Sequence, residues 1–174
     1  FSRILSNYPM INFIQLNKMI LCLLLCSASL LVIVFYSQYV LNMTPCKLCI
    51  WQRVPHAIVV TTSLLMIANK KYQNLGCIIC CITIFFSILL SGYHAGIEYN
   101  FWTGPLSCSS SRIPNTLSPE LFLEAILTTS VPRCDEVVWT FLNTSMAGWN
   151  LLLSILLLIL WTLVTLKVLR DPRC

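Results

Sequence analysis

Charged residues are scarce in this sequence. Asp, Glu, Lys and Arg make up 10% of its 174 residues, and only six residues are acidic, whereas a soluble globular domain is about 25% charged. Hydrophobic residues make up 57% of the chain. This balance argues against an ordinary soluble domain and indicates a membrane protein.

Several functional signatures are also missing. The sequence contains no motif typical of flavin, haem or iron–sulfur binding, and no secretory signal peptide with a small-residue cleavage site is recognisable. Although the net charge is +5, the basic residues form no stripe and lie mostly beside apolar runs. Their distribution favours a role in membrane topology over nucleic-acid binding.

Four apolar runs are long enough to cross a bilayer, at about 19–40, 50–69, 75–97 and 147–168. About 20 helical residues cross a hydrocarbon core about 30 Å thick, and a helix satisfies its own backbone hydrogen bonds in lipid. We therefore predict an all-α integral membrane protein, a four-helix transmembrane bundle that forms a single domain over residues 1–174.

The positions of Lys and Arg predict the orientation, because basic residues beside span ends are retained in the cytoplasm. With both termini cytoplasmic, four basic residues lie on the outer side and seven flank the inner ends: Arg3, Lys18, Lys70, Lys71, Lys167, Arg170 and Arg173. Two outer loops result, at about 41–49 and 98–146. In the longer loop, Ser118 as an N-cap and Pro119 at the first helical position predict a short interfacial helix over about 117–129.

The ten cysteines divide by side of the membrane, because disulfides persist only on the oxidising side. Six are expected at the inner side, where cysteine usually packs as a small hydrophobic residue: Cys22, Cys26, Cys77, Cys80, Cys81 and Cys174. The outer four are Cys46, Cys49, Cys108 and Cys134. A zinc site built from these four is disfavoured, because Cys108 and Cys134 lack the spacing of a zinc half-site, and no metal is predicted. A purely structural disulfide between Cys108 and Cys134 is an alternative that leaves the first pair unexplained.

Cys46 and Cys49 form a CxxC motif at the predicted start of a helix. Unpaired N–H groups and the helix dipole favour a thiolate at this position, and a lowered pKa makes cysteine more reactive. Arg53 lies one helical turn after Cys49, so a permanent cation is expected near the sulfur. Cys77 and Cys80 have the same spacing, but they lie inside an apolar run.

A dithiol at the membrane boundary needs an electron acceptor. Because the sequence carries no signature of a bound redox cofactor, a lipid-soluble quinone that reaches the helix ends through the bilayer is the natural acceptor. His94, near the outer end of the third span, is a candidate hydrogen-bond partner for a quinone carbonyl. Glu98, one turn later, is disfavoured in this role, because polar residues at the end of a span are ordinary.

Three segments carry a resemblance to a known family: PCKLCIWQR at 45–53, YHAGIEYNFWTGPLSC at 93–108 and VPRCDEVVWTFLNTSMAGWN at 131–150. With them, the chain resembles the DsbB family of disulfide bond formation proteins over nearly its whole length. The resemblance implies a four-helix protein of the bacterial inner membrane. Such a protein reoxidises the periplasmic thiol oxidase DsbA and passes the electrons to ubiquinone or menaquinone.

The resemblance also implies a role for each outer cysteine. Cys108 would form the mixed disulfide with a DsbA-like partner, and Cys134 would be its loop partner. Cys46 would exchange with this loop pair, and Cys49 would be the thiolate that faces the quinone, near Arg53. One departure is Gln52, where the family often has glutamate.

Two other functions fit part of the pattern. A quinone-linked oxidoreductase similar to vitamin K epoxide reductase also combines four helices, a CxxC motif and a loop pair, but there the CxxC motif follows the loop pair. A non-catalytic four-span assembly protein with structural disulfides predicts that Cys46 and Cys49 are unreactive.

Overall fold

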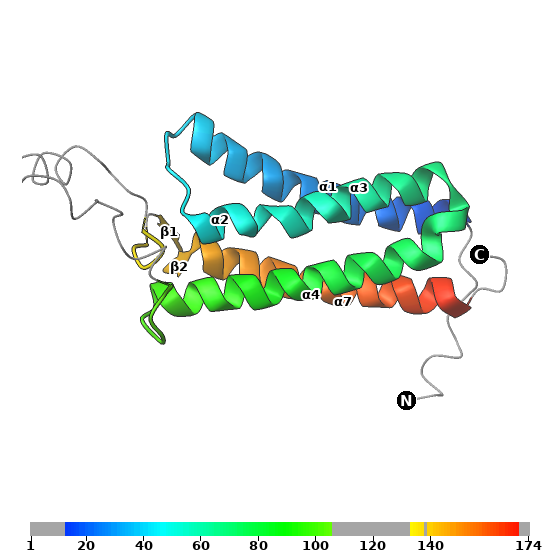
Figure 1. The fold of residues 1–174 in the computed structure, drawn as a ribbon. Coiled ribbons are helices and arrows are strands. Elements are labelled where there is room, and N and C mark those ends of the chain that lie inside the picture. Colours follow the sequence, from blue (N-terminus) through cyan, green and yellow to red (C-terminus); the bar gives the residue numbers. More distant parts are fainter. Residues whose placement is uncertain (1–12, 106–132, 138, 171–174) are drawn as a thin grey trace, which may run out of the picture.

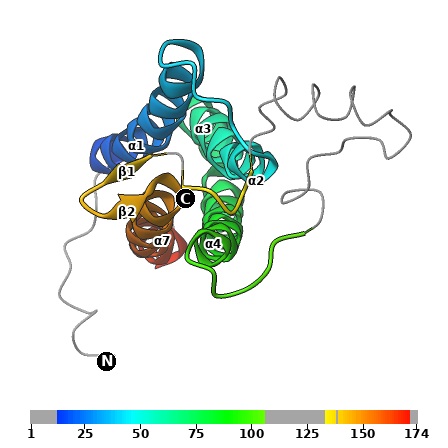
Figure 2. The same cartoon turned by 90° about the vertical axis from the view of Figure 1, so that its left-hand side faces the viewer.

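The computed structural model describes residues 13–105, 133–137 and 139–170, and it shows a bundle of four long helices (Figure 1). Neighbouring helices run in opposite directions, and around the bundle axis they follow the order α1, α3, α4, α7 (Figure 2). Helix α4 has its most extensive contacts with α7. The four helices are α1 (Phe13–Tyr39), α3 (Arg53–Ala68), α4 (Gln73–Glu98) and α7 (Met146–Arg170).

Four short elements complete the described chain. Helix α2 (Lys47–Trp51) precedes α3, and a 3-10 turn, η1 (Lys70–Tyr72), joins α3 to α4. Strands β1 (Thr140–Phe141) and β2 (Thr144–Ser145) pair antiparallel, through a two-residue turn in which both residues have positive φ. Such turns fit the twist of a hairpin. This small hairpin was not predicted from the sequence.

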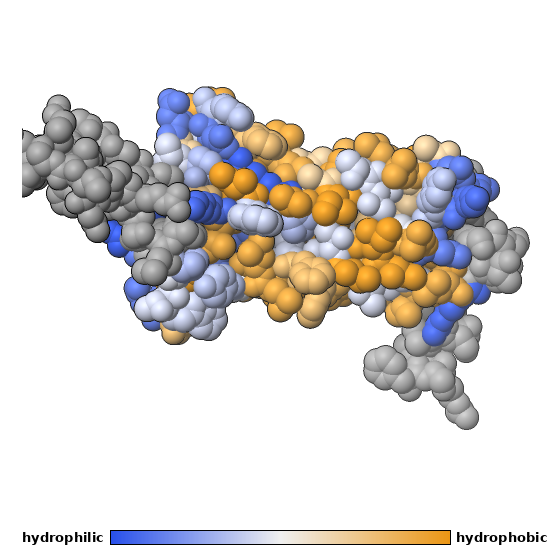
Figure 3. All heavy atoms as spheres, viewed as in Figure 1, coloured by the Kyte–Doolittle hydropathy of each residue, from blue (hydrophilic) through white to orange (hydrophobic). Residues whose placement is uncertain are grey.

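The all-α membrane fold is confirmed. Within the described residues, three helical segments are long and apolar enough to cross a membrane: Gln15–Tyr39, Lys70–Glu98 and Met146–Arg170. Apolar side chains cover the middle of the bundle and polar ones its two ends (Figure 3). The run predicted at 50–69 is helical, but α3 has only 16 residues, so its role as a fourth span stays a prediction, as does the orientation. The helix predicted at 117–129, like Cys108 and Cys174, lies outside the described residues.

Helices α2 and α3 are separate because of Pro55. A proline has no N–H to donate to the carbonyl four residues earlier, and its ring crowds that carbonyl, so it is tolerated only in the first turn of a helix. Pro55 is the third residue of α3, and the preceding helix ends at Trp51, four residues before it. Gln52 therefore lies at the joint between the two helices, where its side chain is buried against α4.

The core of the bundle includes the second CxxC motif. Cys77 and Cys80 are fully buried among apolar residues that include Met66, Ile84 and Trp161. Their predicted packing as small hydrophobic residues is thus confirmed. Cys22 and Cys26 are instead exposed on α1, because α1 contacts the bundle along another face.

We predict that Gly76→Ala lowers the thermal stability of the protein and that Gly92→Ala does not. A Cβ at Gly76 would lie 2.5 Å from two side-chain atoms of the fully buried Met66, whereas the nearest atom at Gly92 is a methyl group of Leu151 at 3.8 Å. Overpacking costs about 1–3 kcal/mol. Thermal unfolding of both variants in one detergent tests the difference. Equal unfolding midpoints would contradict the close approach of α3 and α4.

Candidate functional site

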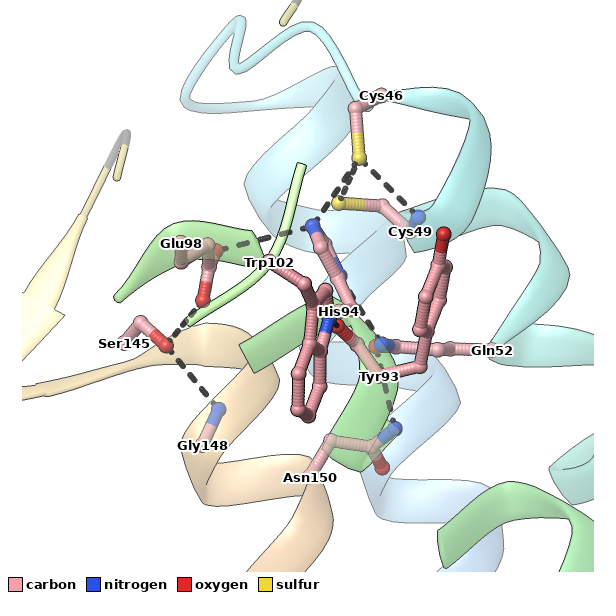
Figure 4. A network of polar contacts seen from close by, with 10 residues as sticks. All are labelled: Cys46, Cys49, Gln52, Tyr93, His94, Glu98, Trp102, Ser145, Gly148 and Asn150. Atoms are coloured by element: carbon pink, nitrogen blue, oxygen red, sulfur yellow. Dashed lines mark hydrogen bonds and ion pairs between the residues drawn. The ribbon is translucent and has the colours of Figure 1, made fainter. Parts of the chain in front are cut away.

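The CxxC thiols lie at the start of α2, as the sequence predicts. Cys46 is the N-cap residue, and its Sγ accepts a hydrogen bond from the backbone N–H of Cys49 at 3.2 Å. The two sulfur atoms are 2.8 Å apart, with Cys46 as the donor (Figure 4). Cys46 is buried and Cys49 is half-buried. The pair is therefore close enough to form a disulfide after a small movement.

The hydrogen bond between the two sulfurs shifts their pKa values in opposite directions. It lowers the pKa of Cys49, although burial and the nearby Glu98 carboxylate act in the opposite direction. It raises the pKa of Cys46 to about 12, and burial adds to this effect. The first proton to leave the pair therefore comes from Cys49, which becomes a thiolate held by the Cys46 thiol.

A third cysteine packs against this pair. Cys134 is 1% exposed and belongs to one buried cluster with Cys46, Leu48 and Ile97, against which Cys49 also packs. The negative charge of a Cys134 thiolate also raises the pKa of Cys49. Beside it, Arg133 donates two hydrogen bonds to Asp135. The structure thus brings together three of the four predicted reactive cysteines.

His94 connects the thiols to a chain of buried polar side chains. Its Nε2 lies 3.5 Å from the sulfur of Cys46, and its Nδ1 lies 3.0 Å from the amide nitrogen of Gln52. Gln52 accepts a hydrogen bond from Asn150 at 3.2 Å, and Asn150 accepts one from Nε2 of His56 at 3.0 Å. Figure 4 shows the part of this chain from His94 through Gln52 to Asn150. Through His56 it also reaches α3, so these hydrogen bonds connect α4, the joint between α2 and α3, α7 and α3.

The position of the proton on His94 depends on the direction of these hydrogen bonds. Because Gln52 donates to Nδ1, the neutral ring has its proton on Nε2, which faces Cys46. If the side-chain amides of Gln52 and Asn150 are both turned, so that oxygen and nitrogen exchange places, each hydrogen bond of the network runs in the opposite direction and no atom position changes. When Gln52 donates to Nδ1, Nε2 carries the proton and can donate it to the Cys46 sulfur. When the amides are turned, Nδ1 carries the proton and Nε2 can accept one from the sulfur.

Glu98 approaches the same nitrogen of His94 as the sulfur of Cys46 does. Its Oε1 is 3.8 Å from Nε2 of His94, and its Oε2 accepts a hydrogen bond from the hydroxyl of Ser145. The Ser145 hydroxyl in turn accepts the backbone N–H of Gly148 in the first turn of α7. Glu98, disfavoured as a quinone partner from the sequence, therefore borders the site through its contact with His94.

Arg53 is directed toward α1. It donates a short hydrogen bond to Gln38, and its guanidinium lies 5.1 Å from the centre of the Phe35 ring. The groups that shift the pKa of Cys49 are Cys46, Glu98 and Cys134. The sequence placed Arg53 one turn after Cys49 in a continuous helix, but the joint at Gln52 interrupts that helix.

An apolar hollow lies between α3 and α4, on the side of Leu90. Its volume is about 410 Å³, and it is open to the surroundings of the bundle. Leu90 also packs against the cluster that contains the reactive cysteines. The lining residues are Trp51, Val54, Pro55, Phe86, Leu89, Leu90 and Tyr93.

Sequence reasoning missed the three side chains that support His94. Gln52 was noted only as a departure from the family pattern, and His56 and Asn150 were not singled out. A signal existed, because polar residues within apolar spans are costly and are usually paired. Asn150 follows the start of the last apolar run, and His56 interrupts the second.

Together, the fold and the site define a class: a helical membrane protein with a pair of close thiols at the end of its bundle. A sequence-family model described as disulfide bond formation protein DsbB matches residues 17–164. The match covers most of the chain. The chain therefore belongs to the DsbB family, and membership implies a role in protein disulfide formation.

Individual relatives agree with this family. An uncharacterized protein of Rickettsia prowazekii, RP370, is 30% identical over 158 residues, which are 88% of this chain and 92% of the relative. Disulfide bond formation protein B of Hahella chejuensis is 29% identical over 84% of this chain and 89% of its own length. The corresponding protein of Acinetobacter baumannii is 26% identical over 74% and 79%.

We predict that Cys46→Ala raises the pKa of Cys49. The substitution removes the thiol that stabilises the Cys49 thiolate and leaves burial and Glu98, which both raise the pKa. Alkylation rate follows the thiolate fraction. Mass spectrometry of the reduced protein should therefore show that labelling of Cys49 reaches its plateau at a higher pH in the variant. Cys77→Ala is the control, and the same pH profile in all three proteins would contradict the sulfur–sulfur hydrogen bond.

Proposed function

We propose that this protein oxidises a periplasmic DsbA-like thiol oxidase and passes the two electrons to a membrane quinone, ubiquinone or menaquinone. Disulfide exchange carries the electrons from the partner to Cys108 and Cys134, and then to Cys46 and Cys49. The overall reaction converts a partner dithiol and a quinone into a partner disulfide and a quinol. Membership of the DsbB family supports disulfide formation in the partner. The packing of Cys134 against Cys46 supports exchange between the two cysteine pairs.

The burial of Cys134 against the CxxC pair is the observation that carries the proposal. Exchange requires a thiolate to reach a disulfide sulfur directly. Cys134 follows a loop of which 106–132 lie outside the described residues, yet it packs in one cluster with Cys46. A Cys134 thiolate released by the partner can attack Cys46, which forms the Cys46–Cys134 disulfide and leaves Cys49 as a thiolate.

The acidities of the pair suit this order. The sulfur that leaves in the attack on Cys46 is Cys49, and a thiol of lower pKa is the better leaving group. The pKa of Cys49 is lowered, whereas that of Cys46 is raised to about 12. Both shifts belong to the reduced pair. Once Cys46 has entered a disulfide it has no S–H to donate, but the hydrogen bond from its backbone N–H remains to lower the pKa of Cys49, which favours release of Cys49.

The apolar hollow between α3 and α4 supports a quinone as the acceptor. Its lining is almost entirely hydrocarbon and aromatic, it opens to the surroundings of the bundle, and Leu90 joins it to the cysteine cluster. A bound quinone supplies a two-electron, two-proton acceptor. Arg53, held by Gln38 and Phe35 on the α1 side, stays a hypothesis as a quinone contact.

His94 is the residue that we propose to manage protons. Oxidation of two thiols releases two protons in a buried site, and the ring nitrogen 3.5 Å from Cys46 can accept one of them. Gln52 and Asn150 orient the ring through its other nitrogen. Proton transfer by a positioned side chain accelerates a reaction by about 100-fold or more.

We predict that Cys49→Ser abolishes quinone reduction and leaves a mixed disulfide between Cys108 and the DsbA-like partner. The serine cannot close the CxxC disulfide, so electrons from the partner do not reach the acceptor. Quinol formation is followed by absorbance, and the mixed disulfide by non-reducing electrophoresis.

The matched control for this prediction is Cys80→Ser, which removes the last sulfur of the second CxxC motif and should leave turnover unchanged. Unchanged quinone reduction in Cys49→Ser would refute the proposed role of Cys49. Failure of Cys46 and Cys49 to react with an alkylating reagent after mild reduction would instead favour the non-catalytic assembly protein.

We predict that Gln52→Leu slows quinone reduction by about 10-fold or more, because His94 loses the partner that orients it. Gln52→Glu should retain most of the rate, since a carboxylate can accept hydrogen bonds from both His94 and Asn150. Formation of the mixed disulfide with the partner should continue in both variants. An equal loss of rate in both, with equal stability to heat, would contradict a positioning role for Gln52.

A further inference from the structure

We propose that the reduced site is also a binding site for a thiophilic divalent metal ion of the Zn²⁺ type. The sulfur atoms of Cys46 and Cys49 and the Nε2 of His94 all lie within 4.8 Å of one another. Two thiolates and an imidazole are ligands that Zn²⁺ prefers. The sequence did not reveal this group, because His94 lies on a different helix from the CxxC motif.

The distances fit a tetrahedral site with one adjustment. With Zn–S of about 2.3 Å and Zn–N of about 2.1 Å, tetrahedral donors are about 3.5–3.8 Å apart. Cys46 Sγ and His94 Nε2 already have this spacing, at 3.5 Å. The two sulfurs, at 2.8 Å, need to separate by about 1 Å, which rotation of the half-buried Cys49 side chain can provide.

The support for the histidine is already present. A metal-binding histidine usually donates its other N–H to a carbonyl or carboxylate, which fixes the ring. The Nδ1 of His94 lies 3.0 Å from the amide of Gln52, and Asn150 holds that amide from behind. With both amides turned, Nδ1 donates to the Gln52 oxygen and Nε2 is free to bind the ion.

Cys134 is the fourth ligand that we propose. It lies outside the 4.8 Å group, but it is buried in the same cluster and its charge affects Cys49. Three thiolates and one imidazole form a closed set of the kind found in structural zinc sites. In the part of the chain that the structure describes, Cys77 and Cys80 belong to no such group.

This site exists only in the reduced protein. A sulfur in a disulfide cannot act as a thiolate ligand, so metal binding and the oxidised state exclude each other. Each coordinating thiol releases its proton to solvent. A bound ion would hold α2, α4 and the segment around Cys134 together and would block disulfide exchange. Metal binding itself does not depend on the proposed electron acceptor.

Cobalt titration of the full-length protein tests this proposal. The protein is reduced in detergent, freed of reductant without air, and titrated with Co²⁺ as the probe. We expect thiolate-to-cobalt charge transfer and the visible absorption of tetrahedral cobalt at one ion per chain, both lost on addition of Zn²⁺. Protein with an oxidised CxxC pair should show neither signal.

Three variants test which residues bind the metal ion. His94→Gln and Cys134→Ser should each weaken Co²⁺ binding by about 10-fold or more, whereas a variant with both Cys77→Ser and Cys80→Ser should bind as the parent does. Binding unaffected by His94→Gln, or lost with the Cys77 and Cys80 pair, would overturn the proposal. Thermal unfolding of each variant separates loss of a ligand from loss of the fold. Because the readout is absorption without quinone or partner, failure of the oxidase function would not affect it.

Discussion

The hydrogen bond between Gln52 and His94 is the interaction on which the site depends. It joins the interruption between α2 and α3 to the end of α4, in a region where both side chains are buried. A buried polar group without a partner costs about 1–3 kcal/mol, so each residue requires the other. Asn150 then satisfies the second atom of the Gln52 amide and is satisfied by His56. One chain of hydrogen-bonded side chains thereby connects α3, α4 and α7 beside the thiols.

The parts of the structure that were predicted from the sequence are those with a local cause. An apolar run of about 20 residues indicates a membrane helix from its own composition. The bounds of α4 and α7 agree with the predicted runs to within two residues, and so does the end of α1, whereas α1 begins at Phe13, before the predicted 19. Pro45 and the following apolar run likewise indicate that Cys46 and Cys49 open a helix. The two CxxC motifs were separated by the same reasoning, because the apolar run around Cys77 and Cys80 indicates burial in the bundle.

The parts that escaped prediction depend on contacts between distant segments. The sequence around Arg53 predicts a side chain on the face of Cys49, but Pro55 interrupts the helix, and contacts with Gln38 and Phe35 on α1 decide the direction of the guanidinium. Gln52 and Asn150 are 98 positions apart, and no local pattern connects them. The same holds for Cys134, whose burial beside Cys46 arises only when the end of the long loop packs on α2 and α4.

The electrostatics of the site also bear on the acceptor. The groups that stabilise the Cys49 thiolate are neutral donors, namely the Cys46 thiol and a backbone N–H, while the Glu98 carboxylate raises its pKa. A negatively charged acceptor would meet both the thiolate and Glu98 in a partly buried region, where repulsion between like charges is weakly screened. A neutral, apolar acceptor meets no such barrier and matches the lining of the hollow beside Leu90. The charges around Cys49 and the apolar lining of the hollow thus both fit the acceptor that we propose, a neutral molecule from the lipid phase.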